Sequence, residues 1–252
     1  MILLLGGTTE SLEVADVLTD KKVPFIISVI SDYGAELASK HGQKVAKITF
    51  TSENFPIFCH EHHIDFILDA THPFARVISQ LAIDEARKLD IPYLRFERQN
   101  NYSKNADLKM VNSLEEACQY LKQVEGKIYL STGSKTAPTY AEVLGVDRLH
   151  VRVLPTTKVT GKLTDAGFLA SQIDGIQGPF SVALNVELFK HSSAKVVVTK
   201  ESGRQGGVQE KIAACEQLGI PCVIIRRPQI SYPHMVSSLH ELKKNLGENN
   251  EW

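Results

Sequence analysis

The amino-acid sequence predicts an α/β protein built from two Rossmann-like lobes, each a doubly wound parallel sheet, with a cleft between them. Short apolar runs alternate along the chain with segments of helical periodicity, and such runs are typical of parallel strands covered on both faces. The 252 residues have room for two lobes. Residues 98–107 are polar and lack periodicity, so we expect an N-terminal lobe over residues 1–98 and a C-terminal lobe over residues 108–252.

The first half contains an alternating series of strands and helices. We expect strands at residues 2–5, 25–30, 44–48, 66–70 and 92–96, with a helix after each of the first four. The helix after the fourth strand has the clearest pattern, because Ile78, Leu81, Ala82 and Leu89 form one apolar stripe at helical spacing.

The second half repeats this alternation. Its expected strands lie at residues 127–130, 148–153, 182–184, 195–199 and 222–225, although residues 182–184 fit a helix equally well. A helix over residues 208–218 is indicated by its apolar face, by Gly219 after its last turn and by Pro221 beyond it. Residues 243–252 are polar, and we expect a frayed end there.

Composition excludes several classes of function. The net charge of −1 disfavours a nucleic-acid partner, which needs a basic face. The four cysteines form no CxxC pair, so neither disulfides nor a zinc site is expected, and the cluster at residues 59–63 lacks a second group of metal ligands. No apolar run approaches the roughly 20 residues of a membrane helix, and no signal segment is recognisable. We therefore expect a cytoplasmic protein without a membrane partner; its oligomeric state stays open.

A glycine-bearing turn follows the first predicted strand. Gly6, Gly7, Thr8 and Thr9 come directly before a helix. Glycines allow close approach of the backbone, and the N–H groups at a helix start bind anions. The turn departs from GxGxxG, and glycine and threonine also occur in turns that bind nothing. It predicts a phosphate or nucleotide site, with a plain turn as the alternative.

The loop after the second strand is a candidate for the ribose of a dinucleotide. It comprises Ser31, Asp32, Tyr33 and Gly34, and in a dinucleotide fold this position faces the adenosine ribose. Asp32 would accept hydrogen bonds from free ribose hydroxyls and favour NADH, whereas Ser31 and neighbouring lysines would suit NADPH. An ordinary turn is the alternative.

The loop after the fourth strand lies beside the first strand, across the switch point where ligands of such sheets bind. It comprises Thr71, His72, Pro73 and Phe74. Pro73 suits the first turn of the next helix, where its missing N–H has no partner to lose. His72 is either a functional group or a structural hydrogen-bonding residue.

Two loops of the second half follow the same logic and are candidates for the substrate. They comprise Ser131, Thr132, Gly133, Ser134 and Lys135 after one strand, and Lys200, Glu201, Ser202, Gly203 and Arg204 after another. A polar loop with a cation between a strand and a helix receives anions. We expect Arg152 and Lys158 to contribute further positive charge, although a solvated loop is the alternative at residues 200–204.

Four motifs together resemble one family. They are LLLGGTTES at the start, DATHPFA in the first half, PYLRFER before the polar division, and TKESG followed by GG, EK and LGIP. In order and spacing they resemble the precorrin-6A or cobalt-precorrin-6A reductases of cobalamin biosynthesis, from Met1 to about Pro228. Glu201 departs from the family's frequent TKNSG form.

The resemblance implies a nicotinamide cofactor, NADPH or NADH, and a small-molecule tetrapyrrole substrate with several carboxylates. It implies reduction of one carbon–carbon double bond of the macrocycle. By the same resemblance residues 6–9 hold the pyrophosphate and residues 71–74 lie near the nicotinamide ribose. Lys200, Ser202 and Gly203 border the substrate or the reactive end of the cofactor.

Such a reduction needs a proton as well as a hydride. We predict Lys200, and after it His72, as the catalytic proton donor. Two other functions stay open: another NAD(P)-dependent oxidoreductase of a small polar substrate, and a non-catalytic dinucleotide-sensing module. A Tyr-x-x-x-Lys pair would favour the first of these, but no lysine follows Tyr129 or Tyr140 at that spacing.

Overall fold

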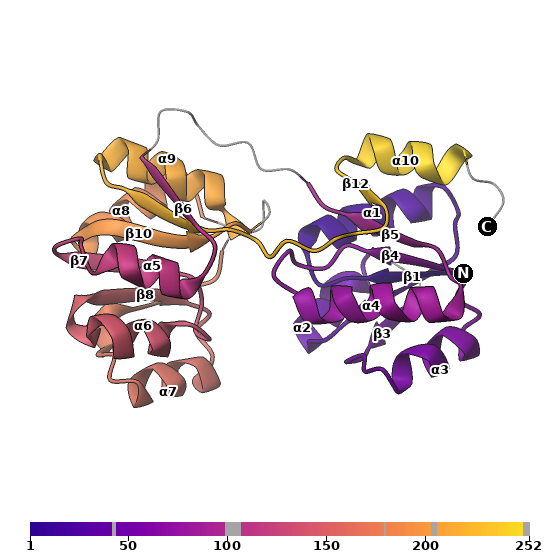
Figure 1. The fold of residues 1–252 in the computed structure, drawn as a ribbon, viewed down its shortest axis with the longest axis horizontal. Helices are drawn as coiled ribbons and strands as arrows, with labels where there is room; N and C mark the ends of the chain where they lie inside the picture. The colour runs from indigo at the N-terminus through magenta and orange to yellow at the C-terminus, as the bar shows by residue number, and fades with distance from the viewer. Residues whose placement is uncertain (42–43, 99–106, 179, 203–205, 249–252) are drawn as a thin grey trace. The chain divides into compact units, whose positions relative to one another are not determined.

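The chain forms two compact units in the computed structural model, which describes residues 1–41, 44–98, 107–178, 180–202 and 206–248. The first lobe comprises residues 1–99 and 228–252, and the second lobe comprises residues 100–227 (Figure 1). Each lobe contains one six-stranded sheet, and all recorded strand pairs are parallel. The predicted α/β class with two parallel-sheet lobes is therefore confirmed.

The sheet of the first lobe has the order β12-β5-β4-β1-β2-β3. Its strands are β1 (Ile2–Leu5), β2 (Phe25–Val29), β3 (Val45–Lys47), β4 (Phe66–Asp69), β5 (Tyr93–Phe96) and β12 (Met235–Val236). Leu5 at the end of β1 lies opposite Ser28 of β2 on one side and Asp69 of β4 on the other. The chain reverses its direction of winding between β1 and β4, so this pair marks the switch point.

Helices cover both faces of this sheet. Side chains alternate across a strand, so Ile2 and Leu4 pack into one core while Leu3 and Leu5 pack into the other. The first core also receives α1 (Thr9–Asp20), α2 (Asp32–Ala38) and α10 (Leu239–Glu248). The second receives α3 (Asn54–Glu61) and α4 (Arg76–Leu89).

The second lobe repeats the strand order. Its sheet has the order β6-β11-β10-β7-β8-β9. The five strands from β9 to β11 correspond to the five from β3 to β5, whereas the outermost strand comes first along the chain in this lobe (β6) and last in the first lobe (β12). The strands are β6 (Leu108–Val111), β7 (Lys127–Ser131), β8 (Leu149–Val153), β9 (Ile173–Gly175), β10 (Ala194–Lys200) and β11 (Cys222–Ile225). The helices are α5 (Leu114–Leu121), α6 (Ala137–Leu144), α7 (Thr157–Asp165), α8 (Val182–His191) and α9 (Val208–Leu218).

The predicted C-terminal boundary is wrong, because residues 228–252 belong to the first lobe. Met235 and Val236 pair with Arg95 and Phe96, which adds β12 to the first sheet. Leu242 and Leu246 are buried in the core beside α1, and Figure 1 shows α10 next to that helix. The expected frayed end is thus helical to residue 248, because leucines three and four residues apart give it an apolar stripe.

Other differences fall on short or ambiguous segments. Residues 182–184 open α8, so the strand alternative is wrong. Sequence patterns missed β6 and β9, which lie at the two edges of their sheet and are largely half-exposed. An edge strand of three or four residues leaves no apolar run to recognise. In the described part of the chain, no helix combines the length and apolarity needed to cross a membrane.

Candidate functional site

The turn between β1 and α1 is held by its own side chains. Thr8 is the N-cap of α1: its Oγ1 accepts the Ser11 N–H at 3.0 Å and donates to the Ala70 carbonyl at 2.8 Å. Ser11 Oγ in turn accepts the N–H groups of Gly7 and Thr8 at 3.2 Å. Thr8 therefore caps α1 and ties the end of β1 to the end of β4.

Gly7 leaves this turn open to solvent. Its φ is +106°, and an added Cβ would meet no atom within 4 Å. Gly6 is different, because a Cβ there would lie 2.9 Å from Ile27 Cγ1. Gly6 is thus required by internal packing, whereas Gly7 and the exposed Thr9 present the start of α1 to a ligand.

The loop after β2 starts a short helix. Ser31 Oγ accepts the Gly34 N–H at 3.0 Å and caps α2. Asp32 forms an ion pair with Lys47 of β3, and the hydrogen bond and charge of that lysine lower the pKa of Asp32. Ile30 and Tyr33 are 70% and 55% exposed, so this loop offers an apolar surface beside an ionised acid.

The end of β4 carries a buried ion pair. Asp69 Oδ1 lies 2.7 Å from Arg95 Nη1, and both side chains are at most 1% exposed. The Asp69 carboxylate also accepts the Thr71 N–H and hydroxyl at 2.9 and 2.7 Å and the Tyr93 hydroxyl at 2.7 Å. Arg95 Nη2 bonds to Glu97 at 2.7 Å.

The charges of Asp69 and Arg95 are compensated by each other and by neighbouring residues of the same lobe. Burial by itself would raise the pKa of Asp69, but Arg95 and the bonds from Thr71 and Ser79 outweigh it and lower that pKa. Burial opposes the charge of Arg95 as well, yet Asp69 and Glu97 raise its pKa above the ordinary value. The group is therefore a charged, internally compensated anchor at the switch point.

In the loop of residues 71–74 one side chain is buried and the other three are half-buried. The Thr71 hydroxyl is used by Asp69 and Arg95, whereas His72, Pro73 and Phe74 are half-buried. The Phe74 N–H donates to His72 Nδ1 at 3.1 Å. The predicted place of Pro73 in the first helical turn is wrong, because α4 begins at Arg76.

In the second lobe the loop after β7 is partly structural. Ser131 Oγ accepts Arg152 Nη2 at 2.9 Å, and the buried Thr132 accepts the Thr136 hydroxyl at 2.9 Å. Gly133 has a φ of +87° with open space beside it. Ser134 and the exposed Lys135 complete the turn before α6.

The end of β10 and the loop after it contain a half-buried cation, Lys200, followed by two residues that bond to backbone groups, Glu201 and Ser202. Lys200 is half-buried, and burial together with the nearby Lys135 lowers its pKa. Glu201 accepts the Arg227 N–H at 3.0 Å, and the buried Ser202 donates its N–H to the Lys200 carbonyl at 2.7 Å. Gly203 and Arg204, both predicted in the substrate loop, lie outside the described residues.

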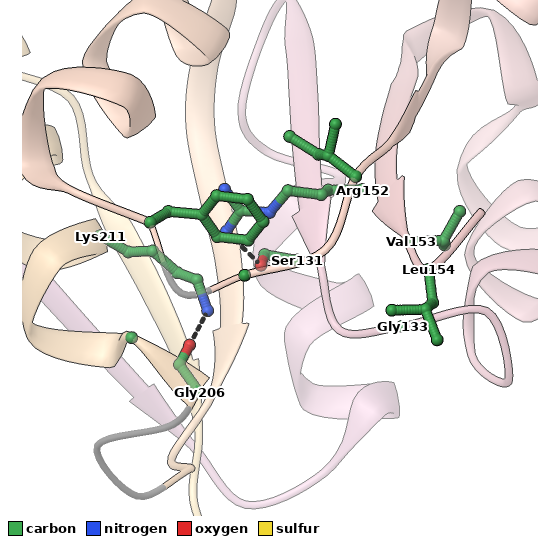
Figure 2. A pocket seen from close by; sticks show the side chains of 11 residues that line it. Ser131, Gly133, Arg152, Val153, Leu154, Gly206 and Lys211 are labelled. Atoms are coloured by element: carbon green, nitrogen blue, oxygen red, sulfur yellow. Dashed lines mark hydrogen bonds between the residues drawn. The ribbon is translucent and has the colours of Figure 1, made fainter. Parts of the chain in front are cut away.

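A cavity of about 230 Å³ lies where β7 and β8 end, beside residues that follow β9 and residues at the start of α9. Figure 2 shows Arg152 and Lys211 reaching into it from β8 and α9. Its remaining lining residues come from strand ends and following loops: Ser131, Gly133, Val153, Leu154, Ile176, Gly178, Phe180, Gly206 and Gly207. In the described residues no group of three or more His, Cys, Asp or Glu side chains is arranged to hold a metal.

The sequence motifs contain three charged residues that sit inside strands and a helix, but no role was predicted for them. Asp69, Arg95 and Lys211 are all at most 5% exposed. A signal was present, since a charged residue inside an otherwise apolar segment is rarely buried without a role. Their partners are far away in sequence, such as the 26 residues between Asp69 and Arg95, so spacing could not reveal them.

The fold and these strand ends define a class: an α/β protein of two Rossmann-like lobes, each with glycine-bearing polar loops at the switch point of its sheet. The family model described as Precorrin-6x reductase CbiJ/CobK matches residues 1–246. The chain belongs to this family, and it is an oxidoreductase.

Individual relatives agree with this family. A cobalt-precorrin-6A reductase of Priestia megaterium is 35% identical over 96% of both chains. One of Methanocaldococcus jannaschii is 31% identical over 97% of both, and a precorrin-6A reductase of Rhodococcus erythropolis is 30% identical over 91% of this chain and 90% of its own. A solved structure of a CobK precorrin-6A reductase, 21% identical, covers 99% of this chain and 97% of its own with a TM-score of 0.81, which supports the fold.

Proposed function

We propose that this protein reduces one carbon–carbon double bond in the macrocycle of cobalt-precorrin-6A or precorrin-6A during cobalamin biosynthesis. The observation that carries the proposal is the family match over residues 1–246, with full-length relatives named for this activity. The relatives at 35% and 31% identity are named for the cobalt form. That naming favours cobalt-precorrin-6A as the substrate.

We assign the dinucleotide to the first lobe. Such a cofactor, NADPH or NADH, supplies a hydride when bound. The open backbone of Gly7 and the exposed Thr9 at the start of α1 suit a pyrophosphate. Gly6 and Thr8 hold this turn, residues 31–34 would border the adenosine ribose, and residues 71–74 would border the nicotinamide ribose.

The choice between NADPH and NADH depends on the Asp32–Lys47 pair. Asp32 suits free ribose hydroxyls, and Lys47 suits a 2′-phosphate. Because Asp32 and Lys47 form an ion pair, an acceptor for ribose hydroxyls and a cation for a 2′-phosphate lie side by side. Each charge therefore weakens the effect of the other on the choice of cofactor.

We assign the carboxylate-bearing substrate to the second lobe. The supporting residues are Lys135 and Lys200, which follow β7 and end β10 and lie close enough for Lys135 to lower the pKa of Lys200. Two cations this close together favour an anionic ligand. Lys200, half-buried at a strand end, is the preferred proton donor, and His72 is the second candidate.

The direct test is anaerobic turnover. We expect the purified protein to oxidise NADPH or NADH when cobalt-precorrin-6A or precorrin-6A is added, with the absorbance of cofactor and macrocycle changing in step. Comparing the four substrate and cofactor combinations gives both preferences. Binding of a nicotinamide without oxidation by either macrocycle would contradict the proposal and favour a dinucleotide-sensing module.

A further inference from the structure

The cavity at the switch point of the second lobe contains two buried cations. Arg152 and Lys211 are 6% and 5% exposed, and both line the cavity. Burying a charge is costly unless an opposite charge compensates it. The hydrogen-bond partners of these two cations therefore decide whether the lobe is complete without a ligand.

Among the described residues, the hydrogen-bond partners of these two cations are neutral oxygens. Arg152 donates to Asn185 Oδ1 at 2.8 Å and to Ser131 Oγ at 2.9 Å. Lys211 Nζ lies 3.3 Å from Thr199 Oγ1 and donates to the Gly206 carbonyl. Neither cation forms an ion pair with a carboxylate in the part of the chain that the structure describes.

Nearby acids are used elsewhere or lie farther away. Asp174 accepts the Tyr129 hydroxyl at 2.5 Å and lies 3.0 Å from His150 Nε2. Glu210, in the first turn of α9, acts on Lys211 only as a more distant charge. Burial, followed by the charge of Arg152, lowers the pKa of Lys211 to about 7, in keeping with the neutral partners of its ammonium group.

We infer that this cavity binds an oxyanion between Arg152 and Lys211. The ring of Phe180 lies 4.4 Å from the Arg152 guanidinium and shields one side of it from water. The cavity also includes Gly206 and Gly207 at the start of α9, a helix without a side-chain cap, so the positive end of its dipole faces the same space. An anion there would supply the missing negative charge.

The size of the cavity indicates one group of a larger ligand. Its 230 Å³ is below the roughly 300–1,000 Å³ of pockets that enclose whole small molecules. The source of the oxyanion is inferred from the proposed function. It is either a carboxylate of the macrocycle or a phosphate of the dinucleotide. Both would use the same two cations, and the experiment below distinguishes them.

The test compares ligand binding to the full-length protein and to two variants at Lys211. Lys211→Met removes the charge, and Lys211→Gln also removes it but keeps a donor for the Gly206 carbonyl. Lys162→Met changes an exposed lysine of α7, outside the cavity, as the control. Titration calorimetry with NADP⁺, inorganic phosphate and uroporphyrin, a carboxylate-bearing macrocycle, reports each affinity.

Both Lys211 variants should lose affinity by about tenfold or more, because a charge-assisted hydrogen bond is removed. A loss for NADP⁺ and phosphate assigns the site to a phosphate, and a loss for uroporphyrin assigns it to a carboxylate. Unchanged affinity for all three probes in both folded variants overturns the inference. These measurements need no turnover, so a protein that binds as predicted yet fails to reduce precorrin-6A would retain the site and lose only the proposed function.

Discussion

The two lobes share a strand order and differ in charge at the same point of the sheet. Leu5 of β1 lies opposite Asp69 of β4 in the first lobe, and Ser131 of β7 lies opposite Thr199 of β10 in the second. The first lobe neutralises its buried acid with Arg95. The second lobe instead buries Arg152 and Lys211 beside a cavity. Topology therefore fixes where a ligand can bind, whereas the residues at that place decide which ligand it is.

The largest expected effect concerns which lobe supplies the proton. Lys200→Met should lower turnover by about 100-fold or more, as loss of a general acid does, while the affinity for the nicotinamide changes little. His72→Asn, in the corresponding loop of the first lobe, should have a smaller effect. Steady-state kinetics with cobalt-precorrin-6A measure both. A full loss in His72→Asn with normal turnover in Lys200→Met would move the proton donor to the first lobe.

Removing one buried cation from each lobe should change stability in opposite directions. Arg95→Met leaves Asp69 buried without its counter-charge and should destabilise the first lobe by about 3–5 kcal/mol. Lys211→Met removes an uncompensated charge and should raise the unfolding midpoint of the ligand-free second lobe. Urea unfolding followed by circular dichroism checks both. Equal destabilisation by the two substitutions would contradict the view that Arg95 is compensated by an acid whereas Lys211 is not.

The same contrast should appear in the pH dependence of stability. Lys211 has a pKa near 7 in the folded lobe and an ordinary value of 10.5. Between these values the unfolded chain binds more protons than the folded chain, so this lysine makes stability rise with pH. Asp69 acts at the acid end: its lowered pKa adds stability above its unfolded value, which is lost as the pH falls through the folded value.

Unfolding midpoints measured from pH 7 to pH 10 isolate the lysine contribution when wild type is compared with Lys211→Met. The upward slope should be steeper in wild type, because other groups titrate equally in both proteins. Identical slopes would mean that Lys211 keeps an ordinary pKa in the folded lobe.

Much of the fold was accessible from sequence because the central strands are mostly apolar. Residues 2–5 and 66–69 are buried without exception, and runs of this kind indicate strands in the middle of a sheet. Edge strands β6, β9 and β12 are short and partly exposed, so periodicity did not reveal them. The return of residues 228–252 to the first lobe is a long-range pairing that no local pattern encodes.

For the candidate site, the sequence predicted which loops form it but not the contacts that their residues make. Glycine and polar residues after apolar runs located residues 6–9 and 131–135 correctly at strand ends. The long-range contacts of these loop residues were not predictable, because Thr8 donates to the Ala70 carbonyl and Glu201 accepts the Arg227 N–H, and both contacts depend on neighbours in space. Arg152 was expected to contribute positive charge and Lys211 lies in the EK motif, but the two are 59 positions apart, so the sequence did not show that they meet at one cavity.

A smaller effect should distinguish two helix caps of the same residue type. Thr8→Ala removes the cap of α1 and the bond to the Ala70 carbonyl, and should cost about 1–2 kcal/mol. Thr156→Ala removes only the exposed cap of α7 in the second lobe and should cost about 0.5 kcal/mol. Thermal unfolding compares them, and equal losses would argue against a structural tie between β1 and β4 through Thr8.

The smallest expected effect concerns cofactor choice in the first lobe. Lys47→Ala should raise the KM for NADPH relative to NADH, and Asp32→Ala should shift the ratio the other way. Each change should be about fivefold or less, because exposed charges are screened by water and salt. A ratio that neither substitution alters would place the adenosine ribose away from this loop.

The division of charge between the lobes is tested most directly by an experimental structure of the protein with NADP⁺ and a carboxylate-bearing macrocycle bound. We predict a phosphate or carboxylate oxygen within hydrogen-bond distance of both Arg152 and Lys211, and an unbroken Asp69–Arg95 pair. A liganded structure in which only water contacts Arg152 and Lys211, or in which the ligand breaks the Asp69–Arg95 pair, would contradict it.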